Sequence, residues 1–251
     1  MSTANATSSL ARLLADSQRI VFLTGAGMST ESGIPDFRSP NGLYAKLGGQ
    51  SLFEISHFLE DPGDFYRTGV SLFEKLWRAK PNAGHLAIAA LAGLPGKHVT
   101  VVTQNIDVLH QQAGSPTVFP VHGTIETCTC QECWIRCSGE EVWERAAAGE
   151  LPPRHDCGGI LKPDVVFFGD PLPYRVFAAA EDAIRAADLL VVAGTSLVVY
   201  PAAGLPDRRR PDCRLAIVNH TPTDLDPAAE LVLRENVGTA LAAAVKALGL
   251  P

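Results

Sequence analysis

Short apolar runs rich in β-branched residues recur along the chain, and they limit its possible folds more than any other feature. Each run is continuous rather than alternating in polarity, as expected for parallel strands that are buried on both faces. The runs are Ile20–Leu23, Val99–Thr103, Val118–Val121, Val165–Phe168, Leu189–Ala193, Leu215–Asn219 and Leu231–Leu233. Alanine-rich helical patterns follow or separate several of them, at Asn82–Leu91, Ala178–Ala187 and Gly238–Leu248. Strands that alternate with helices predict an α/β fold with a Rossmann-like, doubly wound parallel sheet.

Two longer stretches interrupt this alternation. Ser39–Trp77 has the apolar spacing of helices. Thr124–Lys162 contains one helical pattern, Glu140–Ala148, and every cysteine of the chain except Cys213. We interpret them as two insertions that together form a smaller, helical and metal-binding domain beside the sheet. The predicted boundaries are 1–38, 95–123 and 163–251 for the larger domain, and 39–94 and 124–162 for the insertions.

A glycine-rich turn, Gly25-Ala26-Gly27, follows the first apolar run. Glycines at the end of a strand let the backbone approach a pyrophosphate, whose charge is met by amide groups and a helix N-terminus. Thr30 stands where the dinucleotide-binding pattern has a third glycine, so a plain strand-to-helix turn is an equal alternative. Gly33 and Pro35 then break the helix that an ordinary dehydrogenase has at this point.

The loop after this break carries Asp36 and Arg38. It could fold over a bound dinucleotide, or the two charges could simply close the loop as an ion pair. Asn105 and Asp107 bracket Ile106 at the end of another run, where an amide and a carboxylate can hold a carboxamide such as that of nicotinamide. Residue types alone favour a different reading, in which this segment caps a helix beginning at Asp107.

His122, next to Gly123, ends the run Val118–Val121. Because imidazole titrates near pH 7, a histidine in this position suits general-base work on a hydroxyl. We assign a further set of histidines to structural or solvent-facing positions: His57, His85, His98, His110 and His220.

Small polar residues end two further runs. Gly194, Thr195 and Ser196 follow Leu189–Ala193 and suit phosphate or ribose oxygens, and Asn219 ends Leu215–Asn219. Ligands of a doubly wound sheet bind in a crevice outside the carboxyl ends of its strands, so we expect these groups to share one site.

Taken in order, these blocks resemble the sirtuins, the NAD-dependent protein deacylases, in their short bacterial form. The resemblance covers residues 19 to 237 and is carried by Gly25–Ser29, Ser32–Arg38, Thr103–His110, His122-Gly123, Val165–Gly169 and Gly194–Pro201. It implies a protein-lysine deacetylase or deacylase that transfers the acyl group to ADP-ribose and releases nicotinamide. NAD would be a consumed cosubstrate, and the partner an acylated lysine in a protein or peptide.

The resemblance also implies roles for individual residues. His122 would deprotonate a ribose hydroxyl of NAD, with Asn105 and Asp107 as the other catalytic residues. The residues implied to bind NAD are Gly25, Ala26, Gly27, Ser29, Thr30, Asp36, Phe37, Arg38, Gln104, Asn105, Ile106, Asp107, His122, Gly194, Thr195, Ser196, Asn219 and Val237. A substrate peptide would add as a strand in contact with Val166, Phe168, Gly169 and Val198, whereas core packing is the expected role of Phe167.

Cys130 and Cys133 have the CxxC spacing of a zinc knuckle. The resemblance predicts a second such pair, but Arg154 stands three residues before Cys157, where its first cysteine should be. Because His155 can ligate, we predict one structural zinc ion bound by Cys130, Cys133, His155 and Cys157. The alternatives are a fourth ligand from Cys128 or Cys137, or a metal-free lobe. We expect Cys213 to be a buried small hydrophobe.

Family members that remove acidic acyl groups bind the distal carboxylate with a Tyr-x-x-Arg pair. The corresponding stretch here is taken to be Tyr66-Arg67-Thr68-Gly69, with Gly69 in place of the arginine. Bidentate pairing of an arginine with a carboxylate gives that specificity. Its absence favours neutral acyl groups, acetyl first, although an apolar channel discriminates weakly against longer chains.

Bulk properties exclude some partners. The net charge of −6 gives no broad basic field, so we expect no nucleic-acid partner. No apolar run approaches the roughly 18 residues that span a bilayer, so we expect no membrane insertion. Clustered cysteines favour metal over disulfides and a reducing, cytoplasmic location. We further expect a monomer, with a frayed terminus over Met1–Ser9.

Three other functions share some of these features. An NAD-linked oxidoreductase has the strand and glycine turn but not the set Asn105, Asp107 and His122. An NAD-dependent protein ADP-ribosyltransferase begins with the same bond cleavage and is the main alternative. A zinc-dependent interaction protein without catalytic activity is the third.

Overall fold

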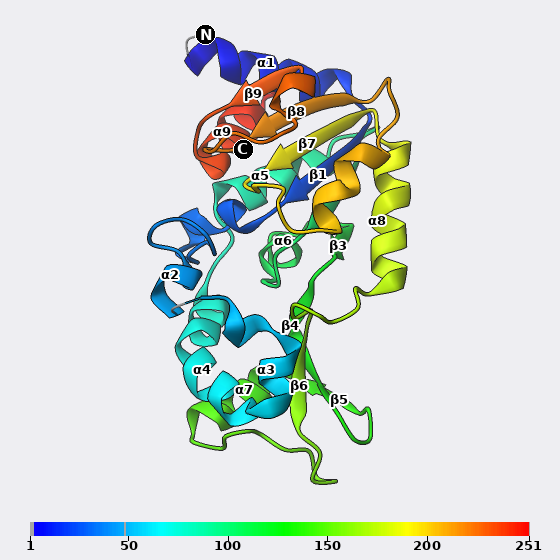
Figure 1. The fold of residues 1–251 in the computed structure, drawn as a ribbon. Coiled ribbons are helices and arrows are strands. Elements are labelled where there is room, and N and C mark those ends of the chain that lie inside the picture. Colours follow the sequence, from blue (N-terminus) through cyan, green and yellow to red (C-terminus); the bar gives the residue numbers. More distant parts are fainter. Residues whose placement is uncertain (1–2, 48, 251) are drawn as a thin grey trace.

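A six-stranded sheet forms the upper part of the molecule in the computed structural model, which describes residues 3–47 and 49–250 (Figure 1). All of its neighbouring strands are parallel. Their order is β3 (Val118–Pro120), β2 (His98–Thr103), β1 (Arg19–Thr24), β7 (Leu189–Ala193), β8 (Arg214–Val218) and β9 (Leu231–Leu233). The order places β1 in the middle, with β2 on one side and β7 on the other, which confirms the doubly wound sheet.

Helices cover both faces of this sheet. On one face, α1 (Thr3–Asp16), α5 (Ala83–Ala92) and α9 (Val237–Lys246) share a core with alternate strand residues such as Phe22 and Val191. On the other face, α8 (Tyr174–Ala186) packs on Leu190 and Val192. Burial on both faces accounts for the continuous rather than alternating apolar runs.

The lower part of the molecule is built from the two interrupting stretches (Figure 1). Its antiparallel sheet has the order β5 (Arg136–Ser138), β4 (Gly123–Cys130) and β6 (Leu161–Val165). Its helices are α2 (Leu43–Leu47), α3 (Ile55–Glu60), α4 (Pro62–Arg78) and α7 (Gly139–Ala147). Short helical segments complete the chain: α6 (Leu109–Gln112), η1 (Ala26–Met28), η2 (Thr30–Ser32), η3 (Ser51–Phe53), η4 (Ala202–Arg208) and η5 (Asp226–Ala228).

Aromatic side chains fill the core of the lower part. Phe73 of α4 stacks on Trp143 of α7, with ring centroids 3.6 Å apart and an interplanar angle of 14°. Phe65 packs between Phe58 and Phe167, at centroid distances of 5.4 and 5.1 Å. Such pairs stabilise a core beyond their area of burial. They hold α4 against the segment that carries Phe167, and Phe167 is a core residue as expected.

Two predicted elements differ from the structure. The run Val165–Phe168 was expected as a parallel strand, but only Val165 is in a strand, and that strand is β6 of the antiparallel sheet. The expectation was wrong because an apolar run does not reveal which sheet it joins. Residues 83–92 were expected within the insertion 39–94, whereas α5 packs through Ile88 and Leu91 on the larger sheet with α9.

Residues 3–9 are helical and not frayed as expected, whereas Met1 and Ser2 of the predicted range lie outside the described residues. Helix α1 begins at Thr3, and its residues Leu10, Leu13 and Leu14 are buried in the core beside α9. Their i, i+3, i+4 spacing forms one apolar face, which the polar start of the sequence concealed. Within the described residues, none of the helices is long and apolar enough to cross a membrane.

Tyr66 provides a test of how the two insertions are joined. Its side chain is fully buried in α4, and its hydroxyl donates a hydrogen bond to the backbone oxygen of Leu161 in β6. Tyr66→Phe leaves the shape of the core intact but removes this bond, so we expect the free energy of unfolding to fall by about 1–3 kcal/mol. Urea denaturation measures the change, and an unchanged midpoint would contradict it.

Candidate active site

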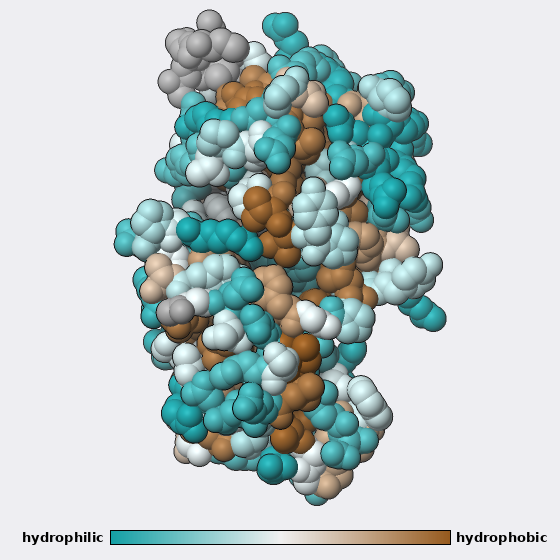
Figure 2. All heavy atoms as spheres, in the orientation of Figure 1, coloured by the Kyte–Doolittle hydropathy of each residue, from teal (hydrophilic) through white to brown (hydrophobic). Residues whose placement is uncertain are grey.

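A cavity of about 760 Å³ lies at the carboxyl ends of β1, β2 and β7, where the upper part of the molecule meets the lower part. Figure 2 shows apolar side chains in a band down the middle of this face. Every residue that the sequence predicted to contact NAD or the peptide lines this one cavity. The crevice expected at the strand ends is therefore present.

The glycine turn after β1 and the turn after β7 pack tightly against each other. The backbone amide of Gly27 donates to the oxygen of Gly194 at 2.8 Å, and a Cβ on Gly27 would lie 2.8 Å from the Cα of Gly194. Gly194 itself has a φ of +65°, in the left-handed region that favours glycine. Side chains at either position would force the two turns apart, and the strand ends would no longer enclose the cavity.

The helix after the glycine turn is broken as predicted. It is reduced to the 3-10 turns η1 and η2, and η2 ends at Gly33, where φ is +85°. In the loop that follows, Asp36 Oδ1 accepts hydrogen bonds from the backbone amides of Arg38 and Ser39, at 3.1 and 2.8 Å. Among the described residues Asp36 and Arg38 form no ion pair, so the Asp36 carboxylate closes the loop by accepting backbone amides and not by pairing with the Arg38 guanidinium.

A buried polar network lies below the glycine turn. Asn105 Nδ2 donates to the oxygen of Gly25 at 3.1 Å and to Ser29 Oγ at 3.0 Å, and Ser29 Oγ donates to Asp107 Oδ2 at 2.8 Å. Burial raises the pKa of the Asp107 carboxyl, and the hydrogen bond from Ser29 lowers it in part. The other oxygen, Oδ1, accepts the amide of Leu109 at 3.1 Å. Asp107 therefore both accepts the amide of Leu109, the first residue of α6, and lines the cavity.

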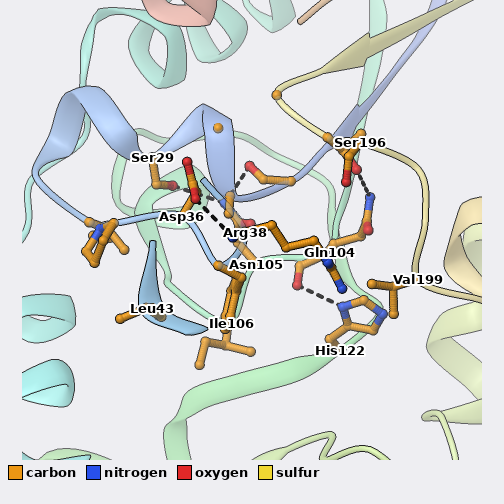
Figure 3. Close-up of a pocket in the computed structure, with 18 of the residues that line it drawn as sticks. Ser29, Asp36, Arg38, Leu43, Gln104, Asn105, Ile106, His122, Ser196 and Val199 are labelled. Carbon is orange, nitrogen blue, oxygen red and sulfur yellow. Dashed lines mark hydrogen bonds between the residues drawn. The ribbon is translucent and has the colours of Figure 1, made fainter. Parts of the chain in front are cut away.

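His122 is held in one tautomer (Figure 3). Its Nδ1 lies 3.0 Å from the backbone oxygen of Gln104. Because a carbonyl oxygen only accepts, Nδ1 must carry the proton in the neutral ring, which leaves the lone pair on Nε2. Burial lowers the pKa of His122, against a smaller upward effect of the Gln104 hydrogen bond. The ring is thus a neutral base on the cavity wall.

Polar groups line the far end of the cavity, beyond Gln104. Gln104 Nε2 donates to Thr195 Oγ1 at 3.0 Å, which joins the ends of β2 and β7. Asn219 lies at the end of β8 and uses its amide on the Thr221 backbone oxygen at 2.9 Å. His220 is exposed, in agreement with its assignment to a structural or solvent-facing position, and it also lines the cavity, where its Nε2 donates to Asn236 Oδ1 at 2.7 Å. In the sequence, its position directly after Asn219 is the feature that could have indicated a place at the cavity.

The segment predicted to contact the peptide is hydrogen-bonded to the backbone of His122. The amide of Val166 donates to the backbone oxygen of His122 at 2.9 Å. Phe168 exchanges backbone hydrogen bonds with the segment 53–55, at 2.8 and 3.0 Å. Across the cavity, Val198 is 56% exposed, so its apolar side chain is available to a ligand.

Helix α4 supplies an apolar wall that the sequence reading did not locate. Phe65, Leu72, Phe73 and Leu76 line the cavity, whereas Tyr66 is fully buried and binds Leu161. A Cβ on Gly69 would contact Trp143 at 3.2 Å. Tyr66 and Gly69 therefore do not occupy the positions that face a ligand, because the helix turns them towards the small sheet and α7. Among the described residues of the lining, Arg38 is the one arginine or lysine.

Three thiols and one imidazole meet at the tip of the lower part. The ligand atoms of Cys130, Cys133, His155 and Cys157 lie within 4.8 Å of one another. Two of the separations are 3.5 Å, between the Cys130 and Cys157 sulfurs, and 3.3 Å, between Cys133 Sγ and His155 Nδ1. These fit the edges of a zinc tetrahedron, about 3.3–3.8 Å for bonds of about 2.0–2.3 Å.

The other cysteines lie outside this cluster. Cys128 and Cys137 face each other across β4 and β5, and Cys128 is fully buried. Arg154, which replaces the expected cysteine, donates to the backbone oxygen of Gly158 at 2.7 Å. Cys213 is buried in the core beneath α8, as expected of a small hydrophobe.

Comparison with known families assigns the chain to one of them. The model of the Sir2 family matches residues 25–201, which include both glycine turns, the buried polar network and His122. The chain belongs to the Sir2 family. A relative from Caldanaerobacter subterraneus, named NAD-dependent protein deacetylase 2, is 42% identical over 243 residues, covering 96% of this chain and 95% of its own. The NAD-dependent protein deacylase 2 of Archaeoglobus fulgidus is 40% identical over 233 residues, covering 92% and 91%.

Solved structures of Sir2 enzymes have the same fold as this chain. One with a deacetylated p53 peptide and 3′-O-acetyl ADP ribose has a TM-score of 0.89 at 37% identity, covering 97% of this chain and 98% of its own. Another with a p53 peptide and NAD⁺ has a TM-score of 0.86 at 37% identity, with the same coverage. A third, bound to a propionylated peptide, has a TM-score of 0.86 at 36% identity, covering 96% and 98%.

Proposed function

We propose that this chain is an NAD-dependent protein-lysine deacylase that transfers the acyl group to ADP-ribose and releases nicotinamide. The names of its relatives and the ligands of its structural neighbours support this reaction. The observation that carries the proposal is the state of His122, a neutral base whose proton is fixed on Nδ1 by Gln104. It lines the same cavity as the glycine turn, and its backbone oxygen accepts a hydrogen bond from the amide of Val166.

The residues divide the chemistry between them. The tight turns at Gly25–Gly27 and Gly194 present backbone to a pyrophosphate, whose charge the amides of η1 meet. Asn105 and Asp107 hold the nicotinamide carboxamide. The acyl oxygen of the lysine then displaces nicotinamide, and His122 Nε2 takes the proton of the ribose hydroxyl that attacks the resulting adduct. Fixing the proton on Nδ1 keeps Nε2 free for this step.

An extended acyl-lysine peptide is the proposed second substrate. It would lie between the segments of Val166–Gly169 and Val198, with main-chain hydrogen bonds as in strand addition. The acyl group would point toward the wall of Phe65, Leu72 and Phe73. Because this wall carries no cation, we propose neutral acyl groups, acetyl first.

One structural zinc ion is proposed at Cys130, Cys133, His155 and Cys157. The donor set of three thiols and one imidazole, and its spacing, support this choice. A closed set of four protein ligands leaves no position for substrate, so the metal would stabilise the lobe and take no part in the reaction. We further propose a reducing, cytoplasmic location, in which the cysteine thiols stay reduced. We also propose that the protein is a monomer.

We also propose the two-domain division, with two boundaries moved. The larger domain would comprise residues 1–38, 83–123 and 166–251, since α5 packs on its sheet and β6 pairs with β4. The smaller domain would then consist of the two insertions, 39–82 and 124–165.

Incubation of the chain with acetyl-lysine, succinyl-lysine and myristoyl-lysine peptides, with and without NAD, tests the reaction. We expect NAD-dependent loss of the acetyl group with release of nicotinamide. Removal of the succinyl group should be at least about tenfold slower, because the apolar wall has no cation to pair with its distal carboxylate. His122→Ala should lower kcat by about 10²–10⁴-fold. His98→Ala, which removes an exposed imidazole at the opposite end of β2, is the matched control.

Three results would contradict this assignment. NADH absorbance without nicotinamide release would indicate an oxidoreductase. Labelled ADP-ribose that stays on the protein would indicate an ADP-ribosyltransferase. Full activity of His122→Ala would remove the base from the mechanism.

The lowered pKa of His122 sets the pH dependence. The base must be neutral, and burial makes it harder to protonate, so the active form persists to lower pH than for a free imidazole of pKa about 6.5. We therefore expect kcat/KM for the acetyl peptide to fall on the acid side with a midpoint below pH 6.5. A pH profile at saturating NAD measures it, and a midpoint above 6.5 would show that burial does not dominate.

Zinc content distinguishes the ligand sets. His155→Ala should lower bound zinc well below one ion per chain after dialysis against a weak chelator, and should lower the melting temperature. Cys137→Ser removes the alternative ligand and should keep both values near those of the unaltered chain. The reverse pattern, measured by elemental analysis, would assign the fourth ligand to Cys137.

A further inference from the structure

Glu31 faces away from the proposed NAD cavity and contacts a distant helix. Its neighbours Ser29 and Thr30 line the cavity, but Glu31 does not. Its carboxylate accepts two hydrogen bonds at the start of α9, from the Gly238 amide at 2.6 Å and from Thr239 Oγ1 at 3.0 Å. These bonds join residues more than two hundred positions apart in the chain.

Helix α9 does not provide this cap itself. Asn236, its N-cap residue, makes no side-chain hydrogen bond to the helix, because its Oδ1 accepts from His220. The first turn of α9 contains no acidic residue. The amides at a helix N-terminus need an acceptor and are stabilised by negative charge, and Glu31 supplies both from outside the helix.

The contact is shaped for this carboxylate. A Cβ on Gly238 would lie 2.5 Å from Glu31 Oε2, so glycine at this position leaves room for the carboxylate to reach the backbone. The same 3-10 segment is held on its other flank by Asn82, the N-cap of α5, whose Nδ2 donates to the oxygen of Met28 at 2.8 Å and to Ser32 Oγ at 3.1 Å. The segment is thus tied to two helix N-termini.

These ties connect two adjoining parts of the cavity wall. Ser29 and Thr30 belong to one part, and Asn236 and Val237, at the start of α9, belong to the other. We infer that Glu31 is a positioning residue for NAD, because it fixes the wall at the glycine turn relative to the wall at the start of α9 before the dinucleotide arrives. The inference rests on the proposed NAD site.

The effect should appear in NAD binding and not in the chemical step. Without Glu31, the two parts of the wall have to be ordered when NAD binds, and that cost weakens binding. Within the part of the chain that the structure describes, the hydrogen bonds of the Glu31 side chain go to the start of α9 and not to His122 or the peptide segment, so we expect the contributions of these two to stay the same. An N-cap contact worth about 1 kcal/mol corresponds to about fivefold in affinity.

Kinetics and calorimetry on the full chain test the inference. We expect Glu31→Ala to raise KM for NAD and the dissociation constant of ADP-ribose about fivefold, with kcat and KM for the acetyl peptide within twofold. Glu31→Gln keeps an acceptor but loses the charge, so it should give a smaller rise. Thr239→Val should weaken ADP-ribose binding partly, and the double variant with Glu31→Ala should bind no worse than Glu31→Ala alone.

Glu235→Gln is the matched control. It removes a carboxylate just before α9 that makes no hydrogen bond or ion pair with the described residues, and it should leave all constants unchanged. Equal ADP-ribose affinity in Glu31→Ala and the unaltered chain would overturn the inference. So would a fall in kcat that follows the folded fraction with KM for NAD unchanged. Failure of the unaltered chain to bind ADP-ribose at all would instead overturn the proposed NAD site on which the inference rests.

Discussion

The close approach of two turns, after β1 and after β7, is the constraint on which the rest of the site depends. The Gly27 amide reaches the Gly194 oxygen only because neither residue carries a side chain at the point of contact. This contact brings the end of β7 against the segment that carries Ser29. Ser29 in turn orients Asn105 and Asp107, and Gln104 next to them joins β2 to Thr195 and fixes the proton of His122. Each polar group is thus placed by the one before it.

Burial then gives these groups their chemical states. Asp107 and His122 both lie in low-dielectric surroundings, where the charged form of each is disfavoured. For the histidine this favours the neutral form, which the proposed reaction requires of a base. For the carboxyl it is opposed by the hydrogen bond from Ser29, so the polar network retains an acceptor for a carboxamide. The same burial therefore serves two different roles.

The sequence predicted the parts of the site that depend on local backbone chemistry. Gly25, Gly27 and the polar residues at the strand ends line one cavity, as expected, and Gly33 ends the second 3-10 turn, where the sequence predicted a break. Long-range packing was not accessible in this way. The pairing of β6 with β4, the place of α5 on the larger sheet and the rotation of α4 all depend on partners distant in sequence.

The rotation of α4 is the clearest example, because it links the metal-binding lobe to the wall of the cavity. Phe73 lines the cavity and at the same time stacks on Trp143 of α7, which belongs to the cysteine-bearing insertion. Gly69 lies one turn earlier, and the absence of a side chain there leaves room for the Trp143 ring. The apolar surface that this wall presents to the cavity therefore depends on how α7 packs, and α7 follows β5 and precedes the segment of His155 in the chain. A structural metal at the tip of this lobe would act on substrate selection through packing alone, without contact with the substrate.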